Sequence, residues 1–307
     1  MEKKKLIVQT DDNDIRLDSY LADNLNKSRS YIQKLIENNS IKVNDEIKSK
    51  KYIVNDGDEI DISFDIKNEI DDIVPCKMDL DIIYEDDDII VINKPKGLVV
   101  HPGAGNFNNT LVNGLMYYTN SLSDVNGIIR PGIVHRIDKD TSGLLVVCKN
   151  NDSHINIAKQ LQDKTCFRKY ICIIDGTIAN DEGVIDAPIG RDSHNRKKMA
   201  VSDSNSKNAI THFKVLERFS KYTLLECSLE TGRTHQIRVH MSYIKHPIVN
   251  DPLYNSKQID DSGQYLHAYY LSFIHPTKNN RVEYKTEIPN YIKEFVKING
   301  GKYFNAN

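Results

Sequence analysis

The sequence predicts an α+β protein with a small N-terminal domain and a larger domain built on a mixed, largely antiparallel sheet. The chain has 307 residues, enough to bury a sizeable core and to divide into two domains. Beyond residue 81, strand patterns are common and long helical patterns are few. Residues 67–81 contain Pro75 and few large apolar residues, so they predict a linker. We place the domains at residues 13–74 and 75–307.

The N-terminal domain is predicted to hold two helices and a small hairpin. Apolar side chains recur at helical spacing in both helical segments, and Ser28 or Ser30 is the expected N-cap of the second helix. Ile60, Ile62 and Phe64 alternate with polar residues, as in a strand with one buried face. In chain order we expect helices at 17–25 and 31–36, strands at 41–43 and 59–64, and turns at 44–45 and 55–58.

Charge is distributed unevenly along this chain, whose formal net charge is -2. Between Lys27 and Lys51 seven basic residues face three acidic ones, whereas residues 79–88 hold six acidic residues and no basic one. The basic segment favours contact with a polyanion, because phosphate contacts dominate nucleic-acid affinity. A solvated charged surface is the alternative explanation, above all for the acidic segment.

Four short motifs near the N-terminus resemble the S4 RNA-binding domain. They are Arg16-Leu-Asp18, Ser28-Arg-Ser30, Ile41-Lys-Val-Asn44 and Asp56-Gly-Asp-Glu-Ile60. Asn39 and Asp45 stand where that family mostly has glycine, and both residue types tolerate left-handed backbone. A helical cap that only packs on the larger domain is the alternative. The RNA-binding residues that the resemblance implies are Arg16, Arg29, Lys34 and Lys48.

In the larger domain we expect strands at 89–93, 144–147, 169–175, 222–229 and 234–240, and helices at 111–117 and 155–161. The segment Lys94 to Gly97 predicts a turn, after which residues 98–100 continue extended. Gly103 and Gly105 lack the third glycine and the strand-to-helix setting of a dinucleotide site, so we interpret them as turn residues.

The segment from Gly132 to Lys149 places charged side chains between two apolar stretches that predict buried strand. The polar cluster spans His135 to Ser142 and includes Arg136 and Asp138. Charged groups are costly to desolvate unless they are paired or functional, so the cluster indicates a functional site. A polar edge between strand and turn, stabilised by local ion pairs, is the alternative.

The run His-Arg-Ile-Asp-Lys-Asp-Thr-Ser-Gly-Leu from His135 resembles the signature of the RluA-type pseudouridine synthases. The same family is resembled by Arg168-Lys-Tyr170, by Leu229 to Met241, by Asn250-Asp-Pro-Leu-Tyr254 and by Leu266-His-Ala268. The catalytic residues that this resemblance implies are Asp138, its ion-pair partner Arg233, and Tyr170. The substrate-binding residues that it implies are Arg136, His135, Thr141, Leu253 and His267.

A basic loop over residues 187–201 resembles the corresponding loop of the RluD branch, which favours large-subunit (23S) ribosomal RNA as the substrate. The phosphate-binding residues expected there are Arg196, Lys197 and Lys198. A transfer-RNA pseudouridine synthase of the same family is the first alternative. A non-catalytic ribosome-assembly factor that keeps the fold to bind RNA is the second.

Pseudouridine formation explains why these residue types are needed. The isomerase breaks the bond between C1′ and N1 of uridine, turns the uracil and rejoins it through C5, so no redox change and no cofactor are required. Asp138 could attack the sugar, attack the base or remove a sugar proton, and each route needs an ionised carboxylate. A guanidinium favours that form. Arg136 would assist extrusion of the target nucleotide, and Tyr170 would stack on its base.

Other classes of protein are disfavoured by the sequence. The five cysteines are scattered without a Cys-x-x-Cys pair, against a disulfide framework or a zinc ribbon. No histidine pattern suits a metal, and no serine-hydrolase elbow or phosphate-binding loop is present. A glycosidase would need a second carboxylate and would have little use for an RNA-binding domain. We therefore expect a cytoplasmic monomer that binds RNA, with no metal and no membrane contact.

Overall fold

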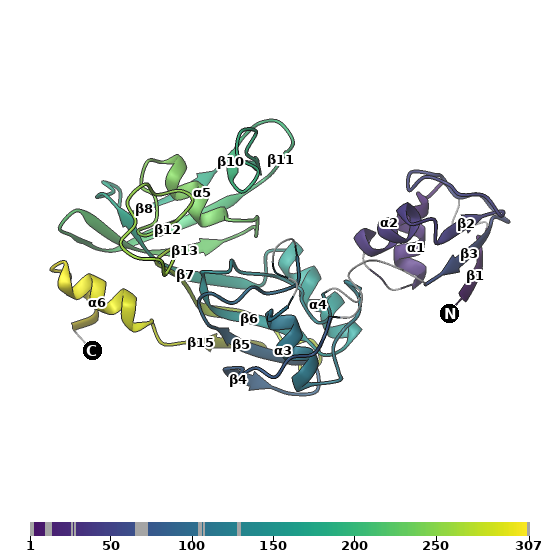
Figure 1. Ribbon diagram of the computed structural model, residues 1–307, viewed down its shortest axis with the longest axis horizontal. Helices are drawn as coiled ribbons and strands as arrows, with labels where there is room; N and C mark the ends of the chain where they lie inside the picture. Colours follow the sequence, from purple (N-terminus) through teal and green to yellow (C-terminus); the bar gives the residue numbers. More distant parts are fainter. Residues whose placement is uncertain are drawn as a thin grey trace.

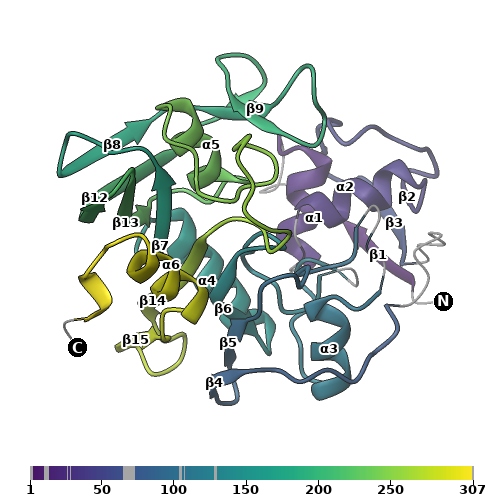
Figure 2. The same cartoon turned by 60° about the vertical axis from the view of Figure 1, so that its left-hand side comes forward.

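The computed structural model describes residues 3–9, 14–25, 27, 29–64, 73–103, 106, 108–127 and 130–305. A small N-terminal domain lies beside a larger domain, and helix α6 (Asn290–Ile298) lies at the far end of the larger domain (Figures 1 and 2). The N-cap expected at Ser28 or Ser30 falls on a residue and a side chain outside this description. None of the helices in the described ranges combines the length and apolar character that a membrane span needs.

The N-terminal domain packs two helices on a three-stranded antiparallel sheet of order β1-β3-β2. Both predicted helices and both predicted strands are confirmed, and the left-handed residues Asn39 and Asp45 lie in turns. Strand β1 was not predicted, because its lysines are exposed and it forms by pairing with distant β3. Its elements are β1 (Lys3–Ile7), α1 (Leu17–Leu25), α2 (Arg29–Glu37), β2 (Ile41–Val43) and β3 (Glu59–Ser63).

The larger domain is built on a nine-stranded sheet in which only the β14–β6 pair is parallel among the described ladders. The expected mixed, largely antiparallel sheet is thus confirmed. Strand order is β4-β5-β6-β14-β7-β13-β12-β8, with β15 paired to β14. These strands are β4 (Ile82–Glu85), β5 (Ile89–Lys94), β6 (Ser142–Cys148), β7 (Phe167–Asp175), β8 (Glu182–Asp186), β12 (Ile210–Phe219), β13 (Tyr222–Leu229), β14 (Leu266–Ile274) and β15 (Arg281–Lys285).

Helices cover both faces of this sheet, because its central strands are apolar on both sides. In β5, Ile90 and Ile92 join the core under α3 and α5, whereas Ile89 and Val91 join the core under α4. A third cluster packs α6 on the same face as α4. The helices are α3 (Leu111–Tyr118), α4 (Asn151–Gln162), α5 (Gln236–Tyr243) and α6. A smaller sheet comprises β9 (Ile189–Arg191), β10 (Met199–Val201) and β11 (Ser206–Lys207).

One predicted strand is wrong: residues 234–240 form a turn and most of helix α5. The alternation of Ile237 and Val239 suggested a period of two, but Ile237 and Met241 share one buried helical face. The helix begins after His235, whose φ is 58°. This difference matters because α5 supplies the side chain that contacts Asp138.

Candidate active site

Asp138 lies in a short loop that is fixed from two sides just before β6. The amide of Thr141 donates to the Asp138 carbonyl at 3.2 Å, which closes a turn. The Lys139 carbonyl accepts from the Gly97 amide at 2.9 Å and from Nζ of fully buried Lys94 at 3.0 Å. The same Nζ donates to two further carbonyls, so one ammonium ties the turn after β5 to the Asp138 loop.

Gly143, next along the chain, lets β6 approach β14 closely. Its φ is 115°, a conformation that favours glycine, and a Cβ there would lie 2.2 Å from the Ala268 carbonyl oxygen. The parallel pairing of β6 with β14 begins at this point. A larger residue would push apart the strands that hold the Asp138 loop.

The guanidinium that contacts Asp138 belongs to Arg238 on α5. Nη1 of Arg238 donates to Oδ2 of Asp138 at 3.1 Å. Asp251, which is fully buried, holds the other side of the same guanidinium, accepting from Nε at 2.7 Å and from Nη2 at 2.9 Å. Asp251 is itself fixed, because Oδ1 accepts from the amides of Leu253 and Tyr254. One arginine therefore bridges two carboxylates.

The predicted pairing of Arg233 with Asp138 is wrong. Arg233 lines the same pocket as Asp138, but its Nε donates to the Asn208 carbonyl at 2.8 Å. Helix α5 starts three residues after Arg233, and the helix supplies the arginine that donates to Asp138. Arg238 and Asp251 lie within the family-like segments, but neither was among the predicted site residues.

Asp138 is held in its ionised form. Burial alone would raise the pKa of this carboxyl, but His235, Arg238 and Arg136 outweigh that effect and lower the pKa below its ordinary value. Burial has the opposite effect on His235: it lowers the pKa of the imidazole, which is therefore neutral at pH 7. The positive charge at Asp138 near neutral pH therefore comes first from Arg238.

Asp138 borders two connected spaces. One pocket also contains Arg136, Thr141, Tyr170 and Arg233, so the structure brings these five predicted residues together. The second space is a cleft of about 520 Å³ that Asp138 shares with Leu253 and Lys197. Oδ2 of Asp138 accepts from Arg238, whereas no residue in the described ranges donates a hydrogen bond to Oδ1.

Two predicted substrate-binding residues, His135 and His267, do not line the pocket of Asp138. His135 lines a neighbouring cavity, and its Nε2 accepts from the Val146 amide at 3.1 Å, which fixes the ring against β6. His267 lines a different pocket and contacts Ser142 Oγ through Nδ1 at 2.8 Å. The placement of His267 does not agree with direct contact to a substrate at Asp138. Its role there is better described as packing between β14 and β6.

The RNA-binding residues predicted in the N-terminal domain differ in their surroundings. Arg16 and Arg29 both donate to the buried carboxylate of Asp18, so part of their charge serves the domain itself. Lys34 is exposed on α2, and Lys48 pairs with Glu46. Of these four, Lys34 presents the most accessible charge.

The predicted basic loop connects β9 to β10. Lys197 reaches the cleft of Asp138, and Nζ of Lys198 lies 5.8 Å from the ring centre of Tyr254. The carbonyl of Arg196 accepts from Arg191, while the Arg196 side chain is exposed. Of the three predicted phosphate-binding residues of this loop, Lys197 is therefore the one that lines the cleft.

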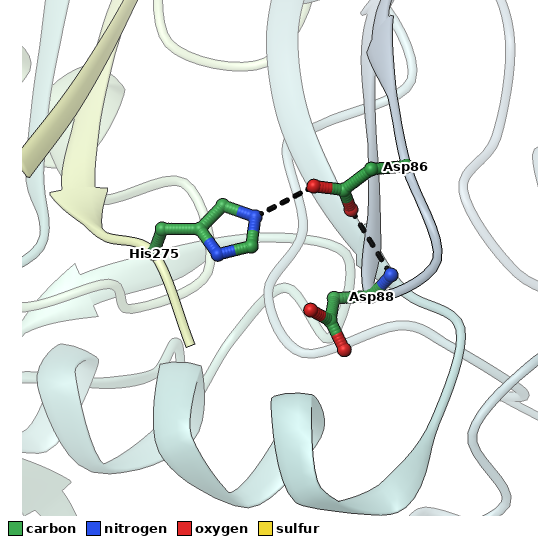
Figure 3. A group of neighbouring side chains, drawn as sticks. All are labelled: Asp86, Asp88 and His275. Atoms are coloured by element: carbon green, nitrogen blue, oxygen red, sulfur yellow. Dashed lines mark hydrogen bonds and ion pairs between the residues drawn. The ribbon is translucent and has the colours of Figure 1, made fainter. Parts of the chain in front are cut away.

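A group of two aspartates and a histidine, Asp86, Asp88 and His275, resembles a metal site in composition (Figure 3). Nε2 of His275 contacts Asp86 at 2.8 Å, while its Nδ1 accepts from backbone amides, so the proton resides on Nε2. Lys278 donates to the same Asp86 oxygen at 2.9 Å. These contacts connect the β4–β5 turn to the β14–β15 turn and account for the group as a structural network.

Comparison with known proteins assigns the family. A model of the RNA pseudouridylate synthase family matches residues 88–243, and an S4 domain model matches residues 15–60. The chain belongs to the RNA pseudouridine synthase family and carries an S4 domain at its N-terminal end. The resemblance read from the sequence is thereby confirmed.

Relatives cover most of the chain. It is 48% identical over 283 residues to the uncharacterized RNA pseudouridine synthase YlyB of Bacillus subtilis, covering 92% of this chain and 93% of that protein. It is 44% identical over 296 residues to ribosomal large subunit pseudouridine synthase D of Neisseria meningitidis, covering 92% and 78%. The structure of human RNA pseudouridylate synthase domain containing 1 aligns with a TM-score of 0.56 at 27% identity, covering 68% and 83%.

Proposed function

We propose that this protein converts uridines of large-subunit ribosomal RNA to pseudouridine, with Asp138 as the catalytic residue. The observation that carries the proposal is an ionised Asp138 whose Oδ2 is bonded to Arg238, at the edge of a cleft that Arg136 and Lys197 also line. The relative from Neisseria meningitidis, named ribosomal large subunit pseudouridine synthase D, supports the substrate class.

The residues around Asp138 divide the task. Arg238 keeps the carboxylate charged and oriented, and Asp251 fixes Arg238. Tyr170 lines the same pocket. Stacking of its ring on an extruded uracil would be worth ~1–3 kcal/mol. Arg136 is exposed between this pocket and the cleft, so it can occupy the space that an extruded nucleotide leaves.

The chemistry requires little besides this arrangement. The glycosidic bond between C1′ and N1 breaks, the uracil turns, and C5 bonds to C1′. C5 then loses its proton, and the freed N1 gains one. Reactant and product have the same atoms, which makes the reaction an intramolecular transfer. The enzyme supplies a carboxylate of lowered pKa beside the pocket that would hold the detached base.

The proposal is tested by mapping pseudouridines in ribosomal RNA from cells that lack the protein, and by incubating purified protein with large-subunit RNA transcripts. We expect specific sites to be missing in the first experiment and restored in the second. Unchanged pseudouridines in both ribosomal and transfer RNA would favour the non-catalytic assembly factor. Loss confined to transfer RNA would assign the other substrate class.

A further inference from the structure

A second cavity, of about 280 Å³, adjoins the pocket of Asp138 and is strongly basic. It shares Arg136, Arg168 and Gly232 with that pocket and adds Arg130. The described residues that line it include no aspartate or glutamate. Three guanidinium groups without a carboxylate repel one another, so an anion is the natural occupant.

Arg168, on β7, is the most unusual of the three. Its side chain is buried, with the residue only 8% exposed. No residue in the described part of the chain accepts a hydrogen bond from its buried Nε. A buried guanidinium without a partner is costly, and the cost is offset when a ligand supplies the missing acceptor.

The neighbouring histidines do not neutralise this cavity. Nη1 of Arg136 lies 3.4 Å from Nε2 of His101, whose Nδ1 contacts the Pro102 carbonyl. Burial lowers the pKa of His101, and the charges of Arg130 and Arg136 lower it further. Burial and then Arg168 lower the pKa of His135 to about 3, so this ring is neutral and adds no charge of either sign.

Gly232 makes room for the Arg168 guanidinium. A Cβ at this position would lie 2.8 Å from Nη1 of Arg168, closer than two unbonded groups can approach. No left-handed backbone is required there, so the glycine is explained by the close contact alone. The Gly232 position therefore offers a way to displace the guanidinium without removing its charge.

We propose that this cavity binds a phosphodiester group of the substrate RNA beside the target uridine, through Arg168, Arg130 and Arg136. This inference rests on the proposed function, because the phosphate in the cavity belongs to the nucleotide whose uracil enters the pocket of Asp138. Binding the backbone here fixes the extruded nucleotide at its sugar-phosphate side, while Tyr170 holds the base. Arginine suits this role because its planar fork can donate two hydrogen bonds to one phosphate.

The test measures binding of a large-subunit RNA transcript to the full chain over a range of salt concentrations. Arg168→Gln and Arg130→Gln should each reduce the slope of log affinity against log salt by about 0.7–0.9, the value for one lost phosphate contact. Gly232→Ala should weaken binding at low salt by less than Arg168→Gln does, because the Arg168 guanidinium has to shift but keeps its charge. Arg218→Gln is the matched control, because Arg218 pairs with Asp181 and donates to nearby carbonyls, and its slope should equal that of the wild type.

Three results would overturn the inference. The first is a wild-type slope in Arg168→Gln together with wild-type affinity in Gly232→Ala, each shown to be folded by its thermal transition. The second is a thermal stabilisation by inorganic phosphate alone that Arg168→Gln removes while the RNA slope stays unchanged, which would assign the cavity to a free anion. The third is loss of the same slope in the Arg218→Gln control. Absence of pseudouridine after incubation would contradict the proposed function instead, since binding slopes are independent of turnover.

Discussion

Asp18 in the N-terminal domain and Asp138 in the larger domain are both aspartates bonded to arginine, yet their surroundings differ. Asp18 accepts four hydrogen bonds, from Arg16 to both oxygens and from Arg29 and Gln33 to one oxygen each. Asp138 accepts one hydrogen bond from Arg238. Two arginines share one carboxylate in the first case, whereas two carboxylates share one arginine in the second.

This difference separates a structural carboxylate from a reactive one. Burial opposes the charged form of both, and the pKa of both is nonetheless lowered by their partners. Each oxygen of Asp18 already accepts two hydrogen bonds from described residues, so little room is left for a substrate. Asp138 keeps its charge and lines the cleft, and its Oδ1 accepts no hydrogen bond from the described part of the chain. A nucleophile or base requires such an available oxygen.

Replacing each aspartate by asparagine should produce opposite phenotypes, and this is the largest expected effect. Asp138→Asn should lower the rate of pseudouridine formation by roughly 10⁴-fold or more, because the charged oxygen is lost from the reaction. RNA binding should be largely kept. Asp18→Asn should retain the chemical rate in single-turnover assays. Comparable rates for Asp138→Asn and wild type would remove Asp138 from the mechanism.

The two candidate arginines of the site come next. Arg238→Gln should lower kcat by roughly 10²–10³-fold, because truncating one partner of a buried charge pair costs about 2–5 kcal/mol. Without the guanidinium, burial raises the pKa of Asp138, so the acid limb of kcat/KM should move to higher pH. Arg233→Gln keeps the ion pair and should lower kcat less than 10-fold. A larger loss of kcat in Arg233→Gln than in Arg238→Gln would instead support the pairing of Arg233 with Asp138 that the sequence predicted.

The sequence could predict Asp138 but not its partner, for a physical reason. The charged cluster around Asp138 can be recognised in the sequence because it lies between two apolar segments. The second segment is strand β6, whereas Ile133 in the first forms only an isolated bridge to Val147. Arg238 depends on the geometry of α5. Gln236 and His240 are one helical turn apart and both contact Thr211, so Arg238 between them points elsewhere, toward Asp138. In a strand the three would share a face.

Other elements were predictable to different degrees. Helices with a clear apolar stripe, such as α1 and α4, were found within a few residues of their ends. Strand β8 was missed, since its pattern of mostly exposed residues becomes a strand only by pairing with β12. The basic cavity depends on residues 130, 136, 168 and 232, which come together only through the sheet. Local patterns indicate elements, whereas pairing across the sheet decides which charges meet.

Asp251 is the second carboxylate that shares Arg238 with Asp138, whereas Asp18 is itself shared by two arginines. Asp251→Asn should lower kcat about 10- to 100-fold, since Arg238 loses one of its two anchors and its donor shifts. Part of the Arg238 charge is then no longer shared, so the pKa of Asp138 should fall further and the acid limb should move to lower pH. The pH dependence of kcat distinguishes this change in the pKa of Asp138 from a general loss of packing, which would lower kcat without moving the acid limb. An unshifted profile would contradict electrostatic sharing.

Asp18 should show its role in stability rather than in rate. Its pKa is lowered in the folded chain, so its contribution is fully present above the unfolded value of about 4 and is lost as pH falls below it. Hydrogen exchange of residues 15–64 in the full chain should report a local loss of about 1 kcal/mol between pH 6 and pH 3, because only the part of this window below the unfolded pKa contributes. Asp18→Asn should retain only the smaller dependence from Asp58, whose pKa is also lowered. Equal pH dependence in both chains would contradict this assignment.

The contact between the two domains should give the smallest effect. Lys27 pairs with Asp124 of the larger domain, but the Asp124 side chain is 55% exposed, so solvent screens the attraction. Lys27→Gln should lower the unfolding free energy of the full chain by about 0.2–1 kcal/mol, and the difference should vanish near 1 M salt. Lys50→Gln, which breaks the Glu37 pair within the N-terminal domain, is the matched control. If Lys27→Gln alone changes RNA affinity, domain orientation contributes to binding; if neither does, the ion pair is a local surface contact.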